Sequence, residues 1–309
     1  MTMKQEGFNL VELMIALVVG IVLMTSITTM FVDTKVSANR SSTVSSLQQQ
    51  AQLALQVLVE DVRSIGSWAE FSGGGFTHIP PVIAAAGCNI QPPASSANST
   101  NWIAAGANVT VDNNCLGLDF DVTGDSDIFF IARIRGVIIP VADVVLNSSR
   151  HYVAISPMQA QLFTGVVPKI ENAEIYPYVH NTYFVQNHAD EGTRLSRFSF
   201  VDGVFTNDLV VGNIEKIRID FGIDTNNDGR ADKYSKSQSI IDVNWSNNSI
   251  VAARIYVLAR AKNKDLTLNN NAEYNKRFSP FTPTSDDNYR RFLLSTTVVI
   301  KNHMMAVAQ

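Results

Sequence analysis

An uninterrupted apolar run lies close to the N-terminus. Residues 8–32 contain one charged side chain, Glu12, and no proline. As an α-helix at about 1.5 Å per residue, this run would extend about 37 Å, which exceeds the hydrocarbon core of a bilayer at about 30 Å. The pattern therefore predicts a transmembrane helix over residues 8–32. Lys4 precedes the run and favours a cytoplasmic N-terminus.

A second helical pattern follows without a break. After Val32 the sequence becomes polar, and apolar residues recur every three or four positions, as they do on one face of an α-helix. These positions are Val44, Leu47, Ala51, Ala54, Leu58, Val62 and Ile65. We therefore expect one long helix over residues 8–65, whose second half packs on the domain that follows. A coiled-coil segment is the alternative, but strict heptads cover too few turns.

The remaining residues, 66–309, have the pattern of a β-rich head domain. Residues 88–115 are rich in Pro, Ser and Asn, which predicts a long surface loop. Short apolar or alternating segments, which are typical of strands, cover residues 118–122, 127–134, 137–146, 152–155, 175–186, 194–201, 214–223, 251–261 and 292–301. The fold class that this order predicts is α+β, with a mostly antiparallel sheet in the head.

Glu12 is the anomaly of the apolar run. A carboxylate inside a bilayer is costly unless it is shallow, protonated or paired. Its position alone leaves two interpretations open. One is a glutamate near the helix end that reaches water or lipid headgroups, and the other is a glutamate retained for a partner in another subunit.

The residues around Glu12 favour the second interpretation. The segment Gly7-Phe8-Asn9-Leu10-Val11-Glu12, after the polar residues 1–7, resembles the prepilin cleavage motif of the type IV pilin and type II pseudopilin superfamily. The resemblance implies that residues 1–7 are a leader, that prepilin peptidase cuts between Gly7 and Phe8, and that the Phe8 amine is then N-methylated. It also implies that Glu12 pairs with this amine on a neighbouring subunit.

Three later blocks, residues 213–224, 253–260 and 290–302, look like the C-terminal half of PilW-type minor pilins, which are related to J-type minor pseudopilins. Residues 66–210 carry no part of this resemblance. It implies a type IV pilin-like fold and a minor pilin that primes pilus assembly and joins the tip complex, with roles in surface piliation, twitching motility, adhesion or DNA uptake. One alternative is a minor pseudopilin of a type II secretion system. Another, from a different class, is a membrane-anchored calcium-dependent binding module.

The same resemblance implies where the protein acts and with what. The chain would first be a single-pass inner-membrane protein with a periplasmic head, and later part of a pilus at the cell surface. Its implied partners are other minor and major pilins, contacted through the N-terminal helix, together with prepilin peptidase, the inner-membrane assembly platform and a tip adhesin.

An Asp/Asn-rich loop after the segment 214–223 matches the first nine positions of a calcium-binding loop. Its oxygen ligands would be Asp224, Asn226, Asp228, Asp232 and the main-chain carbonyl of Arg230. Position 12 is Ser235 rather than the bidentate Glu of an EF-hand, and a strand pattern precedes the loop, so a true EF-hand is not expected. The alternative to a Ca²⁺ site is an Asx-rich turn without metal.

The two cysteines, Cys88 and Cys115, would form one disulfide if the chain is exported; otherwise they are two unrelated thiols. Their spacing does not suit zinc or haem. The five histidines are scattered, and we expect them on the surface or in loops. Because none of the common catalytic motifs is present, the sequence predicts a structural protein rather than an enzyme. A net charge of −4 and the lack of a long Lys/Arg run argue against nucleic acid as a partner.

Overall fold

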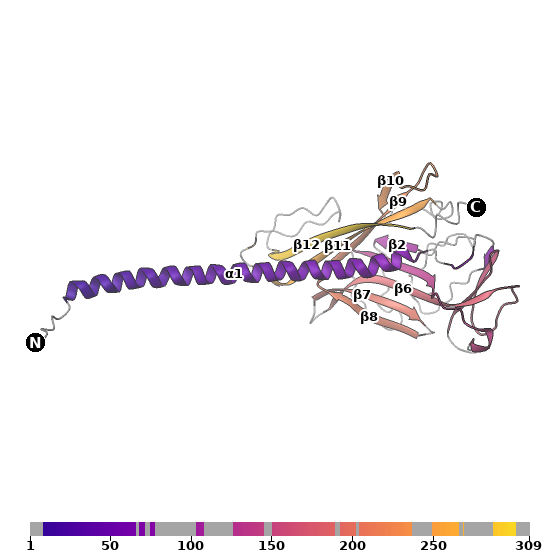
Figure 1. Ribbon diagram of the computed structural model, residues 1–309, viewed down its shortest axis with the longest axis horizontal. Helices are drawn as coiled ribbons and strands as arrows, with labels where there is room; N and C mark the ends of the chain where they lie inside the picture. The colour runs from indigo at the N-terminus through magenta and orange to yellow at the C-terminus, as the bar shows by residue number, and fades with distance from the viewer. Residues whose placement is uncertain are drawn as a thin grey trace, which may run out of the picture. The chain divides into compact units, whose positions relative to one another are not determined.

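The computed structural model describes residues 9–65, 68–71, 75–77, 103–107, 126–144, 150–188, 192–201, 204–236, 249–265, 268 and 287–300. The chain forms two compact units, Met1–Ser46 and Leu47–Gln309. Helix α1 (Leu10–Arg63) begins in the first unit and ends in the second. All the described strands belong to the second unit (Figure 1).

Helix α1 confirms the prediction of one long N-terminal helix. Its buried residues in the second unit are Leu47, Ala51, Ala54, Leu55, Leu58, Asp61 and Val62. This stripe follows the predicted apolar face, except that Val44 is 37% exposed and that Leu55 and Asp61 were not predicted to lie on it. Residues three and four apart share one side of a helix, so the spacing alone accounts for most of the stripe.

The first sheet has eight strands and is built around a long central strand, β6. Its order is β1 (Gly75–Thr77), β5 (Gln159–Phe163), β4 (Tyr152–Ile155), β6 (Glu174–His188), β3 (Asp127–Ile134) and β2 (Ile103–Ala107). Strand β7 (Gly192–Val201) also pairs with β6, and β8 (Val204–Gly212) pairs with β7. Only the pairing of β1 with β5 is parallel among the described strands. A mostly antiparallel head is therefore confirmed.

The second sheet has four antiparallel strands in the order β10 (Lys233–Lys236), β9 (Ile214–Ile223), β11 (Ile250–Lys264) and β12 (Tyr289–Val299). Strand β11 is buried on both faces. Ile255 and Val257 enter the main core, whereas Tyr256 and Leu258 pack with Leu293 of β12 on the other face. This explains why residues 251–261 form a nearly continuous apolar run rather than a clean alternation.

The main core joins the buried stripe of α1 to both sheets. Its members include Leu58 of the helix, Tyr183 and Val185 of β6, Ile217 of β9 and Val257 of β11. Figure 1 shows β6, β7 and β8 along one side of this part of the helix, and β9, β11 and β12 along another. The predicted α+β architecture is confirmed, with the helix face serving as the shared core surface.

Several local predictions were wrong. Residues 137–146 do not form a strand where the structure describes them: 137–140 are irregular, and the 3₁₀ helix η3 (Val141–Asp143) follows. Pro140 lies in the middle of this run, and a proline cannot donate the hydrogen bond that a ladder needs. The predicted loop 88–115 contains β2, which pairs with β3 over its full length. The predicted strand 118–122 lies outside the described residues.

His180 is a further correction, because it lies on β6 and is 6% exposed rather than on the surface or in a loop. Burial lowers the pKa of His180 from 6.5 to about 4. The imidazole is therefore neutral at neutral pH, and its Nε2 lies 3.1 Å from the hydroxyl of Thr182. A buried neutral histidine with a hydrogen-bonding neighbour has a structural role in the sheet.

Candidate functional site

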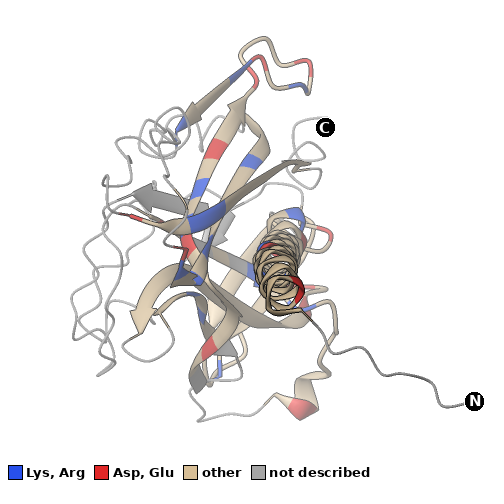
Figure 2. Cartoon of the chain, turned by 90° about the vertical axis from the view of Figure 1, so that its left-hand side faces the viewer, with Lys and Arg blue, Asp and Glu red and all other residues tan. Residues whose placement is uncertain are grey.

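The first part of α1 exposes a continuous apolar surface. From Leu10 to Val32, its large apolar side chains are between 51% and 74% exposed. By its length and composition, α1 is long and apolar enough to cross a membrane. Figure 2 views the chain from its N-terminal side, nearly along the helix, and shows a red acidic band close to its near end. Such a surface is compatible with membrane anchoring and with packing against other apolar helices.

The few hydroxyl groups on this surface are already satisfied. Thr25, Ser26, Thr28 and Thr29 donate hydrogen bonds to main-chain carbonyls three or four residues earlier, at 2.8–3.0 Å. Back-bonding of this kind lets serine and threonine enter hydrocarbon without leaving an unpaired polar group. The polar residues at 25–29 therefore do not prevent this part of the helix from entering an apolar environment.

Glu12 is different, because its charge has no counterpart nearby on the helix. It lies in the first turn of α1 and is exposed. Its main-chain N–H donates to the carbonyl of Asn9 at 3.0 Å. The residues one turn away, Asn9, Ile15 and Ala16, are all uncharged. The N-terminal end of a helix favours an acid by a few tenths of a kcal/mol to about 1 kcal/mol, which is less than the cost of burying it unpaired in hydrocarbon.

Asp61, near the other end of α1, fastens the helix to the first sheet. Its Oδ2 accepts hydrogen bonds from Asn181 Nδ2 at 2.7 Å and from Tyr183 Oη at 2.6 Å. Its Oδ1 lies 3.3 Å from Arg133 Nη2 on β3. Burial and the Asp61 charge raise the pKa of Tyr183, so its hydroxyl remains protonated and donates. One carboxylate thus ties the last turns of α1 to β3 and β6.

The Asp/Asn loop between β9 and β10 is closed by its own hydrogen bonds. Asp224 Oδ1 accepts from the N–H groups of Asn226 and Asn227, at 3.1 and 2.6 Å, and its Oδ2 accepts from Gly229 at 2.7 Å. Gly229 has a φ of 80°, in the left-handed region that glycine enters without strain. These contacts are typical of an Asx turn, and they hold the loop without metal.

The other predicted calcium ligands are held in the same way. Asp228 Oδ1 accepts from the Arg230 N–H at 2.8 Å, and Asp232 Oδ2 accepts from the Thr225 N–H at 2.7 Å. Two hydrogen bonds from Thr225 lower the pKa of Asp232, and the one from its side chain has a larger effect than the one from its main chain. Within the described chain, no three His, Cys, Asp or Glu side chains are grouped closely enough to hold a metal ion. Calcium binding remains a prediction.

A calcium titration tests whether the loop 224–232 binds Ca²⁺. If the loop binds Ca²⁺, a concentration one hundred times the dissociation constant stabilises the fold by about 2.7 kcal/mol, because the ion binds only the folded state. The measurement is the unfolding temperature of the full chain in detergent micelles, and Asp228→Ala should abolish the rise. Asp143→Ala removes an exposed acid of η3, outside the loop, and serves as the control. An unfolding temperature that calcium leaves unchanged would reject the site.

The model of the PilW family, described as type IV pilus-assembly protein W, matches residues 182–302. The head carries a PilW region. It begins inside β6 and extends past β12, so it includes the whole second sheet. The three blocks that resemble PilW-type minor pilins, 213–224, 253–260 and 290–302, all lie within it, which confirms that prediction. Together, the exposed apolar helix and the PilW region support a role for this chain as a pilin related to type IV pili.

Among solved structures, a type IV-like pilin from Thermus thermophilus is similar to this chain, with a TM-score of 0.39 and 9% sequence identity. The alignment covers 83% of this chain and 96% of that pilin. No protein of curated function matches the sequence of this chain.

The structure places only some of the predicted site residues. Glu12 and the loop 224–232 are described, and they lie in different units of the chain. Gly7, Phe8, Cys88 and Cys115 lie outside the described residues, so the cleavage site, the methylated amine and the disulfide remain predictions. Sequence reasoning missed Asp61. This residue lies three positions after Leu58 and next to Val62, and that position on the apolar face was a signal that the acid is buried.

Proposed function

We propose that this protein is a minor pilin that is processed by prepilin peptidase and primes the assembly of a type IV pilus as part of its tip complex. The observation that carries the proposal is the exposed apolar helix with one uncompensated acid, Glu12, in its first turn. The PilW region of the head supports a pilus role over that of a general membrane anchor.

The helix serves this function in two environments. In the membrane its apolar side chains lie in hydrocarbon and store the subunit as a single-pass protein of the inner membrane. During assembly the same side chains leave lipid for the apolar interior of a bundle of neighbouring helices. The change costs little, because both surroundings are apolar and close packing of helices replaces contacts with lipid.

Glu12 sets the register between subunits. Cleavage after Gly7 would create a cationic amine at Phe8, and Glu12 lies four residues further along the chain. An acid inside an apolar bundle is tolerated when a cation neutralises it, so an incoming subunit is held best where its Glu12 meets the amine of a neighbour. The proposed partners are therefore other minor and major pilins, together with the peptidase, the assembly platform and a tip adhesin. The final location is a pilus at the cell surface.

The mature N-terminus tests this proposal directly. Mass spectrometry of the protein from membranes should give a chain that begins with methylated Phe8. A Gly7→Val variant should remain unprocessed, because a branched side chain at the cut blocks the close approach of a protease to the backbone. Gly20→Ala is the matched control, since a Cβ at Gly20 meets nothing within 4 Å and processing should continue. A wild-type chain that still begins with Met1 or Met3 contradicts the proposal.

A minor pseudopilin of type II secretion is the second candidate, because the helix and Glu12 would act in the same way in either machine. The two functions differ in phenotype. Deletion of a minor pilin reduces surface piliation and twitching, whereas deletion of a pseudopilin blocks secretion of folded substrates. A membrane-anchored calcium-dependent binding module predicts no cleavage after Gly7, so the mass spectrum separates that class as well.

A further inference from the structure

The side of α1 opposite its buried stripe carries no charge over a long stretch. Residues 41–59 contain no Asp, Glu, Lys or Arg. At the chain's overall frequency of 17% charged residues, a stretch of this length would hold about three of them. This composition is informative, because the solvent-facing side of a helix normally carries acidic and basic residues one turn apart.

Three glutamines form the middle of this uncharged side. Gln49, Gln52 and Gln56 are exposed, and their spacings of three and four positions place them along one line of the helix. The exposed residues Ser45 and Ser42 continue the same line toward the apolar run. We call these five residues the glutamine stripe.

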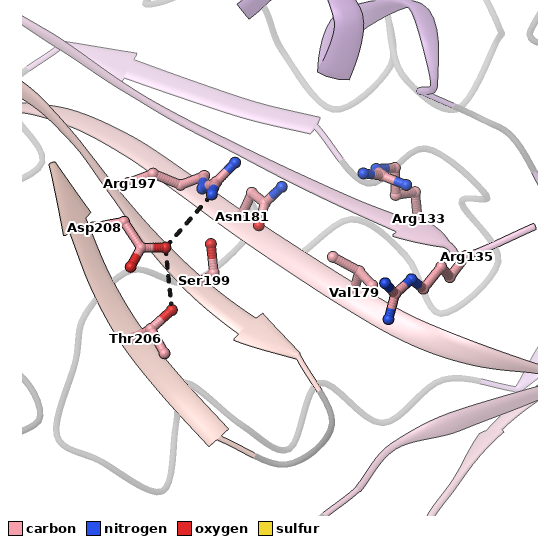
Figure 3. A pocket seen from close by; sticks show the side chains of 8 residues that line it. All are labelled: Arg133, Arg135, Val179, Asn181, Arg197, Ser199, Thr206 and Asp208. Atoms are coloured by element: carbon pink, nitrogen blue, oxygen red, sulfur yellow. Dashed lines mark hydrogen bonds and ion pairs between the residues drawn. The ribbon is translucent and has the colours of Figure 1, made fainter. Parts of the chain in front are cut away.

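The open pocket on the first sheet shows how a surface of the same head looks where it faces water. Arg197 of β7 lies 3.4 Å from Asp208 of β8, and Asp208 also accepts a hydrogen bond from Thr206 at 3.3 Å (Figure 3). The two charged side chains are 35% and 47% exposed. On α1 itself, charges return at Glu60 and Arg63. The lack of charge therefore belongs to residues 41–59 and not to exposed surfaces of this chain in general.

An uncharged polar line of this kind suits burial against another helix. A glutamine amide both donates and accepts, so glutamines of two helices can satisfy one another, whereas a buried charge needs a counterion in a fixed place. Serine is small and lets two helices approach closely. Leu53 is 49% exposed next to Gln52 and adds apolar contact area on this side.

We propose that the glutamine stripe packs against the helix of a neighbouring subunit in the assembled pilus. This inference rests on the proposed function, in which neighbouring helices cover the apolar run of the same helix. The stripe begins ten residues after Val32, so a helix alongside the apolar run reaches it within about 15 Å. Glu12 sets the register near the N-terminus, and the stripe keeps the helices in contact beyond the apolar run.

Two substitutions of opposite charge test the environment of the stripe. Gln52→Glu and Gln52→Lys should each lower the ratio of the protein in sheared pili to that in membranes by about fivefold or more, because either charge would leave water without a counterion. Neither should change the unfolding temperature in detergent, since Gln52 is exposed in the free subunit. Gln159→Glu is the matched control, because Gln159 is an exposed glutamine on β5 and should tolerate the charge.

A photoreactive benzoylphenylalanine at position 52 identifies the occupant in intact cells. Mass spectrometry should map its cross-links to the N-terminal helix of another pilin, and the same group at position 159 should not reach such a helix. Normal incorporation of both charged variants, a loss with one sign of charge only, or cross-links confined to head domains or to proteins other than pilins would overturn the inference. Wild-type protein missing from sheared pili would instead contradict the proposed function, and the inference with it.

Discussion

Replacing Glu12 with alanine should leave the protein in the membrane and reduce its incorporation into pili at least tenfold. Glu12 carries the only charged side chain in the apolar run. Removing it makes the segment more apolar and replaces the glutamate with the strongest helix former, so membrane storage is preserved. A tenfold loss corresponds to about 1.4 kcal/mol per contact, which is modest beside the 3–5 kcal/mol typical of breaking a buried ion pair.

The measurement is the ratio of the protein in sheared pili to the protein in membranes, by immunoblot. Glu12→Gln keeps the size and polarity of the side chain but not the charge, and it should fail nearly as badly as alanine. Asp33→Ala removes the first acid beyond the apolar run and should incorporate normally. Equal incorporation of wild type and the alanine variant would refute the role of Glu12 in subunit pairing.

Replacing Asp61 with alanine should destabilise the head by about 3 kcal/mol, because it leaves three buried or half-buried groups without their acceptor. Tyr183, Asn181 and Arg133 all direct polar atoms at this carboxylate. Tyr183 has 0% exposure, so its hydroxyl has no solvent contact beside the one with Asp61. The effect on the fold should therefore exceed that of any single exposed charge.

Urea unfolding of the full chain in detergent, followed by tyrosine and tryptophan fluorescence, measures this effect as a lower midpoint. Asp61→Asn retains an acceptor oxygen and should lose less stability than alanine. Glu60→Ala changes the preceding, exposed acid on the same helix and should stay within about 0.5 kcal/mol of wild type. A midpoint for Asp61→Ala that matches that of Glu60→Ala would show that the carboxylate does not fasten the helix.

The sequence predicted those elements whose pattern is local. Strand β9 was expected at its observed bounds, because Ile217, Ile219 and Phe221 alternate with polar residues and therefore share one face of the strand. The helix was expected over nearly its whole length for the same reason. Strands β5, β8 and β10 were not expected, because β5 and β10 are short and the polar segment 206–208 interrupts the apolar residues of β8. The pairing partners of these strands decide their conformation.

The candidate sites also divide into those with a local signal in the sequence and those that depend on distant residues. Glu12 could be found from the sequence, because a lone acid in an apolar run is conspicuous without any structure. Asp61 could not, since its partners are far away in the chain. Asn181 follows Asp61 by 120 residues, and a pairing over that separation depends on the strand register. His180 is the opposite case: it was expected at the surface and is buried, and no local feature of the sequence indicates its burial.

The attachment of α1 to β6 also has a mechanical consequence. Asp61 accepts hydrogen bonds from Asn181 and Tyr183 of β6. At both positions β6 is paired with β3 on one side and with β7 on the other. Tension that arrives through the helix therefore enters the interior of the sheet and is shared by two neighbouring ladders of hydrogen bonds. A load applied to an outer strand would instead unzip its ladder one bond at a time. A subunit that must withstand traction gains from this placement.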